Sequence, residues 1–269
     1  MTEERASFAQ QTKVCFDRCV RGFWNDRGWK TFISAALITF LVGLVMSENT
    51  FINYVDTKNG SFALVSACIW IGIFNSIRTV CRERDIVRRE YLTGLNLRSY
   101  VVAHWLYEGC LCAVEALVVT VITRIMSLDH FIEEGVFLPP VVEMYVTFFL
   151  VTFSADALGL LVSSIVSSEN TAMTVMPFVL IVQLVMSGAI FELDGALKAL
   201  SSVTISRWGL AAICASAHAN DMLDSYLYGR AEEQASTTGN LLGLWLILLT
   251  FAVIYAVFAV VALSFVDER

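Results

Sequence analysis

The sequence predicts an all-α polytopic membrane protein with six transmembrane helices, and its composition and the pattern of its apolar runs support this. Hydrophobic residues make up 57% of the 269 residues and charged residues only 16%, whereas soluble domains contain about 45–50% apolar and about 25% charged residues. Long apolar runs are separated by short polar stretches, and the chain contains only 3 prolines. Barrel strands would instead alternate over about ten residues. The composition therefore argues against a soluble globular enzyme and favours helical spans.

The first element expected is an amphipathic helix near the N-terminus. Residues 14–24 place Cys15 and Cys19 on one helical face and Asp17 and Arg21 on the other. This pattern is typical of a helix that lies along a membrane surface. An ordinary solvated helix next to the membrane is the alternative.

Six apolar runs then follow, each a candidate for a helix that crosses the membrane. They cover residues 31–47, 61–77, 100–126, 141–166, 171–190 and 241–265. The first two look short, because a span needs about 20 residues, so we expect their ends to extend into the flanking residues. The chain is thus divided into an N-terminal cytoplasmic region (1–30) and a transmembrane domain (31–269).

Basic residues indicate the orientation of the spans. Residues 1–30 and 78–99 each contain six Lys or Arg side chains, whereas the loops at the other ends of the spans contain only Lys58, Lys198, Arg207 and Arg230. By the positive-inside rule, both termini are expected to be cytoplasmic in a multi-pass protein of the plasma membrane. The net charge of −7 is modest and spread over the loops, so no nucleic-acid partner is predicted.

The segment between the second and third runs is predicted to form a short cytoplasmic helix. Charged and apolar residues alternate at helical spacing in residues 78–100, and Asp85 and Arg89 form a favourable pair four residues apart. Gly94 can end this helix in a left-handed conformation, and Asn96 or Ser99 can cap the next one. The alternative is a plain basic loop. Farther along, residues 191–240 are predicted to form a helical segment before the last span, either external or partly re-entrant.

Several ionisable residues fall inside the predicted spans, where charges are costly. Glu108 and Glu115 share one face of the third span with His104, and Asp156 lies in the fourth. Pairing across helices, a polar pathway through the membrane and a misjudged depth are the three alternatives.

The motifs for other chemistry are absent from the sequence. No phosphate-binding loop, zinc-protease motif or nucleophile elbow occurs. The seven cysteines include no C-x-x-C pair. We therefore predict neither catalytic nor metal-ligating residues, and no cofactor bound by this chain.

Three stretches resemble the transmembrane domain of subfamily G type ABC transporters and their bacterial relatives, the type 2 ABC exporter permeases. They are FWNDRGW after the amphipathic helix, ERDIVRREYLTGLNLRSY between the second and third spans, and SGAIFELDGALKALSSVTISRWGLAA after the fifth. The second stretch follows the family pattern at Glu83, Arg84, Arg89, Glu90, Gly94 and Tyr100. The likeness extends over essentially the whole chain.

The resemblance implies a function and partners. It implies that the amphipathic helix is the family's connecting helix, and that residues 86–95 form a coupling helix that touches an ABC ATPase. The ATPase, separate or detached from this chain, would bind ATP and Mg, and two permease domains would form a homodimer or heterodimer in the lipid bilayer. The coupling residues would be Glu83, Arg84, Arg89, Glu90 and Gly94. The substrate pathway of this exporter would be lined by Cys68, Ile71, Phe74, Asn75, Thr174, Phe178, Ile181 and Val185, which favours a hydrophobic or amphipathic substrate.

The sequence departs from the family at two points, and two rival functions remain open. Ser206 stands where the family has proline before its Arg-Trp pair, and Cys214 is the single cysteine of the external segment, so the disulfides of animal members are not expected. One rival is a membrane-embedded enzyme that uses His104, Glu108 and Glu115 as acid and base. The other is a passive channel or membrane anchor.

Overall fold

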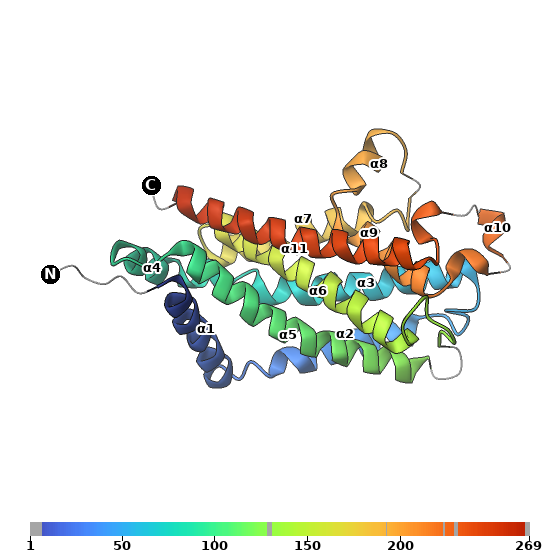
Figure 1. The fold of residues 1–269 in the computed structure, drawn as a ribbon, viewed down its shortest axis with the longest axis horizontal. Helices are drawn as coiled ribbons and strands as arrows, with labels where there is room; N and C mark the ends of the chain where they lie inside the picture. Colours follow the sequence, from blue (N-terminus) through green and yellow to red (C-terminus); the bar gives the residue numbers. More distant parts are fainter. Residues whose placement is uncertain (1–6, 128–130, 192, 223, 229–230, 267–269) are drawn as a thin grey trace.

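The computed structural model describes residues 7–127, 131–191, 193–222, 224–228 and 231–266, and this part of the chain is helical without strands (Figure 1). Its helices are α1 (Phe8–Asn25), α2 (Lys30–Val45), α3 (Tyr54–Ser76), α4 (Thr79–Leu92), α5 (Leu97–Met126), α6 (Pro140–Ile165), α7 (Glu169–Val185), α8 (Ala196–Ser201), α9 (Ile205–Ser216), α10 (Ser225–Tyr228) and α11 (Thr238–Val266), with short 3-10 helices η1 (Ala219–Asp221) and η2 (Glu232–Gln234). The all-α prediction is confirmed.

Four stretches are long and apolar enough to cross a membrane: Tyr54–Leu92, Leu97–Met126, Pro140–Ile165 and Thr238–Phe265. In the first of these the apolar part is α3, because half of the 14 residues of α4 are charged. The pair α1 and α2, bent by 71°, passes the same criteria when taken together. The apolar helix α7 has 17 residues, or about 26 Å at 1.5 Å per residue. Four or five spans are thus found among the described residues, and the count of six remains a prediction.

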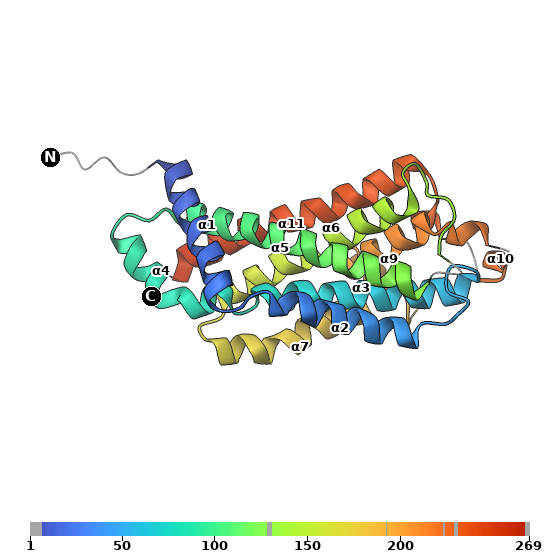
Figure 2. The same cartoon turned by 90° about the horizontal axis from the view of Figure 1, so that it is seen from below.

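The long helices run side by side in one bundle (Figures 1 and 2). α3 packs closely on α6, because Gly72 has no side chain: a Cβ there would lie 2.2 Å from the carbonyl oxygen of Thr152. Figure 2 shows α2 and α7 on one side of the bundle and α11 on the other. α1 and α4 lie at one end, with the N- and C-terminal ends of the chain, and α10 lies at the opposite end.

Several helices begin or end away from their predicted positions, for local reasons. α1 begins at Phe8 because Ser7 and Gln10 form a reciprocal capping box. α3 begins at Tyr54, so the segment before residue 61 is already helical. α7 ends at Val185, just before a turn in which Gly188 has a φ of +74°.

The residues 191–240 fold into two unlike parts. α8 protrudes from the bundle (Figure 1) and exposes most of its residues, whereas 10 of the 12 residues of α9 are buried, where it packs against α3, α6 and α11. Its N-terminus is tied to α7, since the backbone N–H of Ile205 donates to Gln183 Oε1 at 2.9 Å and the Ser206 hydroxyl donates to the Gln183 carbonyl. This burial of α9 agrees with a segment that re-enters the bundle.

Candidate functional site at the junction of α1, α4 and α5

Arg18 of α1 is the centre of the polar contacts at the α1–α4 end. Its Nη1 atom donates to both carboxylate oxygens of Glu90, at 2.8 and 3.0 Å, and Nη2 donates to Glu83 Oε2 at 3.2 Å. Glu83 and Glu90 lie seven residues apart, on the same face of α4. An ion pair near the surface contributes about 0.2–1 kcal/mol to folding stability. The main effect of this contact is therefore to orient the two helices. A guanidinium that reaches two carboxylates on one helix through its two terminal nitrogens restrains the angle at which α1 crosses α4.

Glu83 also joins α4 to α5. The hydroxyl of Tyr100 donates to Glu83 Oε2 at 3.1 Å, and His104 Nε2 lies 3.6 Å from the same oxygen. Burial alone would raise the pKa of Glu83, but His104, Arg18 and the Tyr100 hydroxyl outweigh it and hold the pKa below its usual range. Glu83 is therefore a carboxylate at neutral pH and links three helices.

A second set of bonds attaches the start of α1 to the turn between α4 and α5. The backbone N–H of Asn96 donates to Gln11 Oε1 at 2.7 Å, and Gln11 Nε2 donates to the Gly94 carbonyl at 3.5 Å. The Ser99 hydroxyl donates to the Phe8 carbonyl at 3.3 Å. The start of α1 and its middle, at Arg18, are thus held to the same pair of helices.

The turn itself has the predicted chemistry. Gly94 follows α4 with a φ of +110°, a conformation that favours glycine. Asn96 caps α5, because its side chain accepts from the backbone N–H of Arg98 at 3.0 Å. The helix, however, covers Thr79–Leu92 rather than residues 86–95.

Arg84 connects α4 to the end of α6. Its Nη1 donates to the Val166 carbonyl at 2.5 Å and its Nη2 to the Ser164 carbonyl at 3.2 Å. The hydroxyl of Ser163 accepts from the backbone N–H groups of Val80 and Cys81, at 3.0 and 3.1 Å. α4 is therefore hydrogen-bonded to the end of α6 as well as to α1 and α5.

The opposite face of α4 is free of the bundle. It exposes Asp85, Ile86, Arg88, Arg89, Tyr91 and Leu92, and Leu92 is 80% exposed. Apolar side chains that stand out among charges mark a surface suited to a protein partner. Of the five predicted coupling residues, Glu83, Arg84 and Glu90 hold α4 to its neighbours, and Arg89 lies at this free surface. Gly94 lies in the exposed turn after α4, where its carbonyl accepts from Gln11 of α1.

The predicted pathway residues divide into two groups. Cys68 and Ile71 of α3 are buried within the chain, and Asn75, half-buried, donates to Glu115 Oε2 at 2.7 Å. The remaining five are exposed or half-buried on α3 and α7: Phe74, Thr174, Phe178, Ile181 and Val185. Thr174, Phe178 and Ile181 lie on one face of α7, at helical spacing.

The intramembrane ionisable residues also divide. His104 is next to Glu83, and Glu143 accepts from the backbone N–H groups of Val136, Phe137 and Leu138 at 3.0, 2.8 and 2.9 Å. Glu108, Glu115 and Asp156 are buried in the bundle. Several of their carboxyl oxygens accept no hydrogen bond from the residues that the structure describes.

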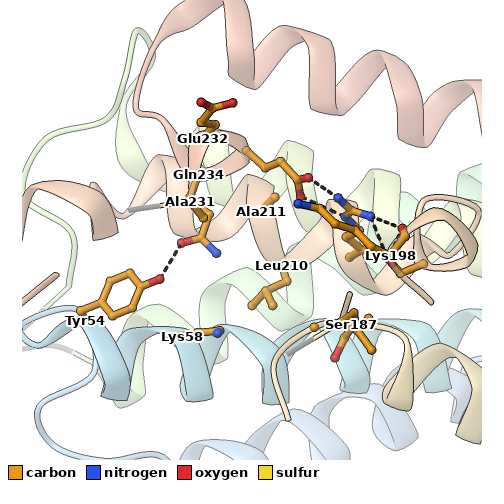
Figure 3. A pocket seen from close by; sticks show the side chains of 14 residues that line it. Tyr54, Lys58, Ser187, Lys198, Leu210, Ala211, Ala231, Glu232 and Gln234 are labelled. Carbon is orange, nitrogen blue, oxygen red and sulfur yellow. Dashed lines mark hydrogen bonds and ion pairs between the residues drawn. The ribbon is translucent and has the colours of Figure 1, made fainter. Parts of the chain in front are cut away.

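A cavity of about 520 Å³ lies away from the junction of α1, α4 and α5, toward the α10 end of the bundle. The start of α3, the turn after α7, α8, α9 and η2 line it (Figure 3). The hydroxyl of Tyr54 donates to Gln234 Oε1 at 3.3 Å on its wall, and Arg207 pairs with Glu233. Lys58 and Lys198 also line it, so the cavity is polar.

The sequence pattern of α1 does not identify Arg18 as a residue that binds α4. The amphipathic pattern indicates which face of α1 is apolar, but not which carboxylates the other face meets. A basic residue on that face, together with two acidic residues seven apart on a charged helix, is the signal that could have suggested the contact.

The fold and this junction define a multi-pass helical membrane protein in which an amphipathic and a charged helix are joined at one end. The chain belongs to the ABC-2 type transporter family, which matches residues 10–218. It is also similar to the ABC transporter ATP-binding/permease protein Rv1747 of Mycobacterium tuberculosis, with 28% identity over an alignment of 222 residues that covers 78% of this chain and 25% of that protein. The chain thus spans about a quarter of the length of that relative. These findings confirm the resemblance to type 2 ABC permeases: the chain is a permease domain of an ABC transporter.

Proposed function

We propose that the chain is the membrane-spanning part of an ATP-driven exporter, which moves a hydrophobic or amphipathic substrate between two permease domains. The observation that carries this proposal is the contact of Arg18 with Glu83 and Glu90, which makes α1, α4 and α5 one mechanical unit. The name of the mycobacterial relative combines ATP binding with a permease. In the present proposal the ATPase, fused or separate, binds ATP and Mg, and this chain performs no hydrolysis.

The free face of α4 is the docking surface for that ATPase. Its exposed apolar side chains, Ile86, Tyr91 and Leu92, insert into the partner, and Arg88 and Arg89 pair with acids around them. The α1–α4 end is cytoplasmic, as the positive-inside rule requires, so both termini lie on the ATPase side of the plasma membrane. When ATP closes the ATPases, α4 moves as a rigid body and carries α1, α5 and the end of α6 with it.

The translocation pathway lies between the exposed faces of α3 and α7 and those of a second permease domain. Phe74, Phe178 and Ile181 stand out from this surface, which supports an apolar lining. Cys68 and Ile71 lie behind it, so they act by packing unless the two helices rotate. An apolar face of this kind is also the surface that a second copy would cover.

The docking surface is tested by purifying the tagged chain with its ATPase from native membranes in mild detergent. We expect the ATPase to co-purify, and we expect Leu92→Asp to release it, because a charge replaces an apolar anchor. Leu200→Asp is the matched control, since Leu200 is equally apolar and 51% exposed, on α8, and this variant should retain the ATPase. Absence of an ATPase from the wild-type preparation, or its retention by both Leu92→Asp and Glu90→Arg, contradicts the proposal.

A further inference from the structure

Three carboxyl groups, those of Glu108 and Glu115 on α5 and Asp156 on α6, gather in the interior of the bundle. Glu108 is 3% exposed, and Glu115 and Asp156 are 0% exposed. Glu108 and Glu115 are seven residues apart, on the same face of α5. Each of the three lies within electrostatic range of another: Glu108 of Glu115, and Asp156 of both.

The hydrogen bonds around these groups are incomplete. Asn75 donates to one oxygen of Glu115. One oxygen of Glu108 and the other oxygen of Glu115 have no partner among the residues that the structure describes. The Ser76 hydroxyl lies close to the Asp156 carboxyl, but it donates to the Asp156 backbone carbonyl at 2.5 Å, which leaves both carboxyl oxygens without a hydrogen bond among the described residues. The hydroxyl of Thr152, one helical turn before Asp156 on α6, is fully buried and also unpaired. Thr152 lies beside the Cys68 thiol, which is itself within electrostatic range of Glu115, so further buried polar groups adjoin the carboxyls.

Within the part of the chain that the structure describes, the charged groups that act on the three carboxyls are the carboxyls themselves, not Lys or Arg side chains. The titratable side chains nearest to them are Cys19 of α1, Cys68 of α3, and Tyr107 and Cys112 of α5. His104, one turn from Glu108, lies against Glu83 and Cys19, and Arg18 is held by Glu83 and Glu90. α11 packs against α5 and α6, and Thr238–Val266 contains no charged residue; its titratable side chain is that of Tyr255.

Glu143 shows how this fold treats a buried carboxylate when donors are present. It is also fully buried, but it accepts three backbone N–H groups. An ionised carboxylate can only accept hydrogen bonds, whereas a protonated one can also donate. Protonation therefore supplies the donors that Glu108, Glu115 and Asp156 lack. A metal ion does not: no group of three ligands with suitable geometry occurs in the part of the chain that the structure describes.

We propose that Glu108, Glu115 and Asp156 form a proton-binding site inside the membrane domain, occupied by protons in the conformation described here, in which the three side chains are buried. The site does not depend on the identity of the transported substrate or on the ATPase. A proton moves between water and a carboxyl oxygen, and no other bond changes. Opening of the bundle to water would ionise the groups, so proton release would accompany the conformational change.

The test uses dicyclohexylcarbodiimide, an apolar reagent that couples to carboxyl groups in their protonated form. The whole chain, in native membranes, is treated at neutral pH and the modified peptides are located by mass spectrometry. We expect adducts on Glu108, Glu115 or Asp156, which become fewer as the pH rises and the groups ionise, and an unmodified Glu143. A Leu246→Glu variant, with a lipid-facing carboxyl on α11, is the control that shows the reagent enters the bilayer.

Infrared spectroscopy provides a measurement that does not need the reagent to reach the site. We expect the C=O band of a carboxylic acid at neutral pH, weakened in Glu108→Gln, Glu115→Gln or Asp156→Asn and unchanged in the exposed control Glu134→Gln. The three amide variants should fold with unchanged thermal stability, because an amide has the size and neutrality of the protonated acid. A band that none of the three substitutions weakens overturns the proposal, as does equal labelling of Glu143.

Discussion

Arg18 Nη1 donates to both carboxylate oxygens of Glu90, at 2.8 and 3.0 Å, across 72 positions of sequence. This contact joins α1 to α4 at one end of the bundle. The two helices can therefore change position together but not independently while the bonds are intact.

The first prediction concerns this pair. Arg18→Glu should place three acidic groups together and uncouple α1 from α4, lowering transport about 10-fold or more while the chain still inserts into the membrane. The double variant with Glu90→Arg should recover part of the activity, because one of the two ion pairs is re-formed with reversed charges. ATP-dependent transport into vesicles measures both. Equal activity in the single and double variants would show that the pair has no coupling role.

The second prediction concerns the close approach of α3 and α6. Gly72→Ala should lower stability by about 1–3 kcal/mol, because the added methyl group collides with backbone atoms rather than with a movable side chain. Gly243→Ala is the matched control, since nothing lies within 4 Å of a Cβ there and alanine favours a helix. Thermal unfolding in detergent should show a lower midpoint for the first variant only. A midpoint equal to that of wild type would mean that the two helices can separate freely.

The third prediction concerns pH. Because the folded-state pKa of Glu83 is depressed below its usual value of 4.5, its stabilisation is complete above that pH and is lost as the pH falls through the folded-state pKa. Glu83→Gln should therefore be less stable than wild type at neutral pH, and the difference should shrink below about pH 4.5. Unfolding midpoints measured from pH 7 to pH 3 test this. A difference that stays constant in acid would exclude an ionised Glu83 as its source.

The fourth prediction concerns Glu143. Glu143→Gln should cost about 1.5–3 kcal/mol per charge-assisted bond lost, since its carboxylate accepts from three consecutive backbone N–H groups before α6. Glu134→Gln, at an exposed position in the same loop, should leave the unfolding midpoint unchanged. Proteolysis of the loop before α6 should also be faster in the first variant. Equal midpoints and equal cleavage rates would assign the loop's order to other contacts.

The sequence was most informative where a single local rule decides the outcome. Apolar runs located the long helices, Gly94 ended α4, and Asn96 capped α5, since each depends on residues that are near neighbours. The burial of α9 was harder to predict, because its small residues, such as Gly209 and Ala212, are only moderately apolar and their packing depends on α3, α6 and α11. The partners of Arg18 and the neighbours of Asp156 depend on contacts between distant segments, which periodicity in one chain does not report.

Arg207 binds Glu233 through two nitrogens, the Lys198 carbonyl at 2.8 Å and the Ser201 hydroxyl at 2.7 Å. The Arg207 side chain, which belongs to α9, thereby connects α9 to both α8 and η2. All seven cysteines are free thiols. The contacts of Arg207 therefore connect these helices without the disulfide bond that many exposed segments contain. The assembly of residues 193–222 therefore requires no oxidant. These residues should therefore fold to the same structure in a strongly reducing cytosol, in an anaerobic host and in a cell-free system that contains dithiothreitol.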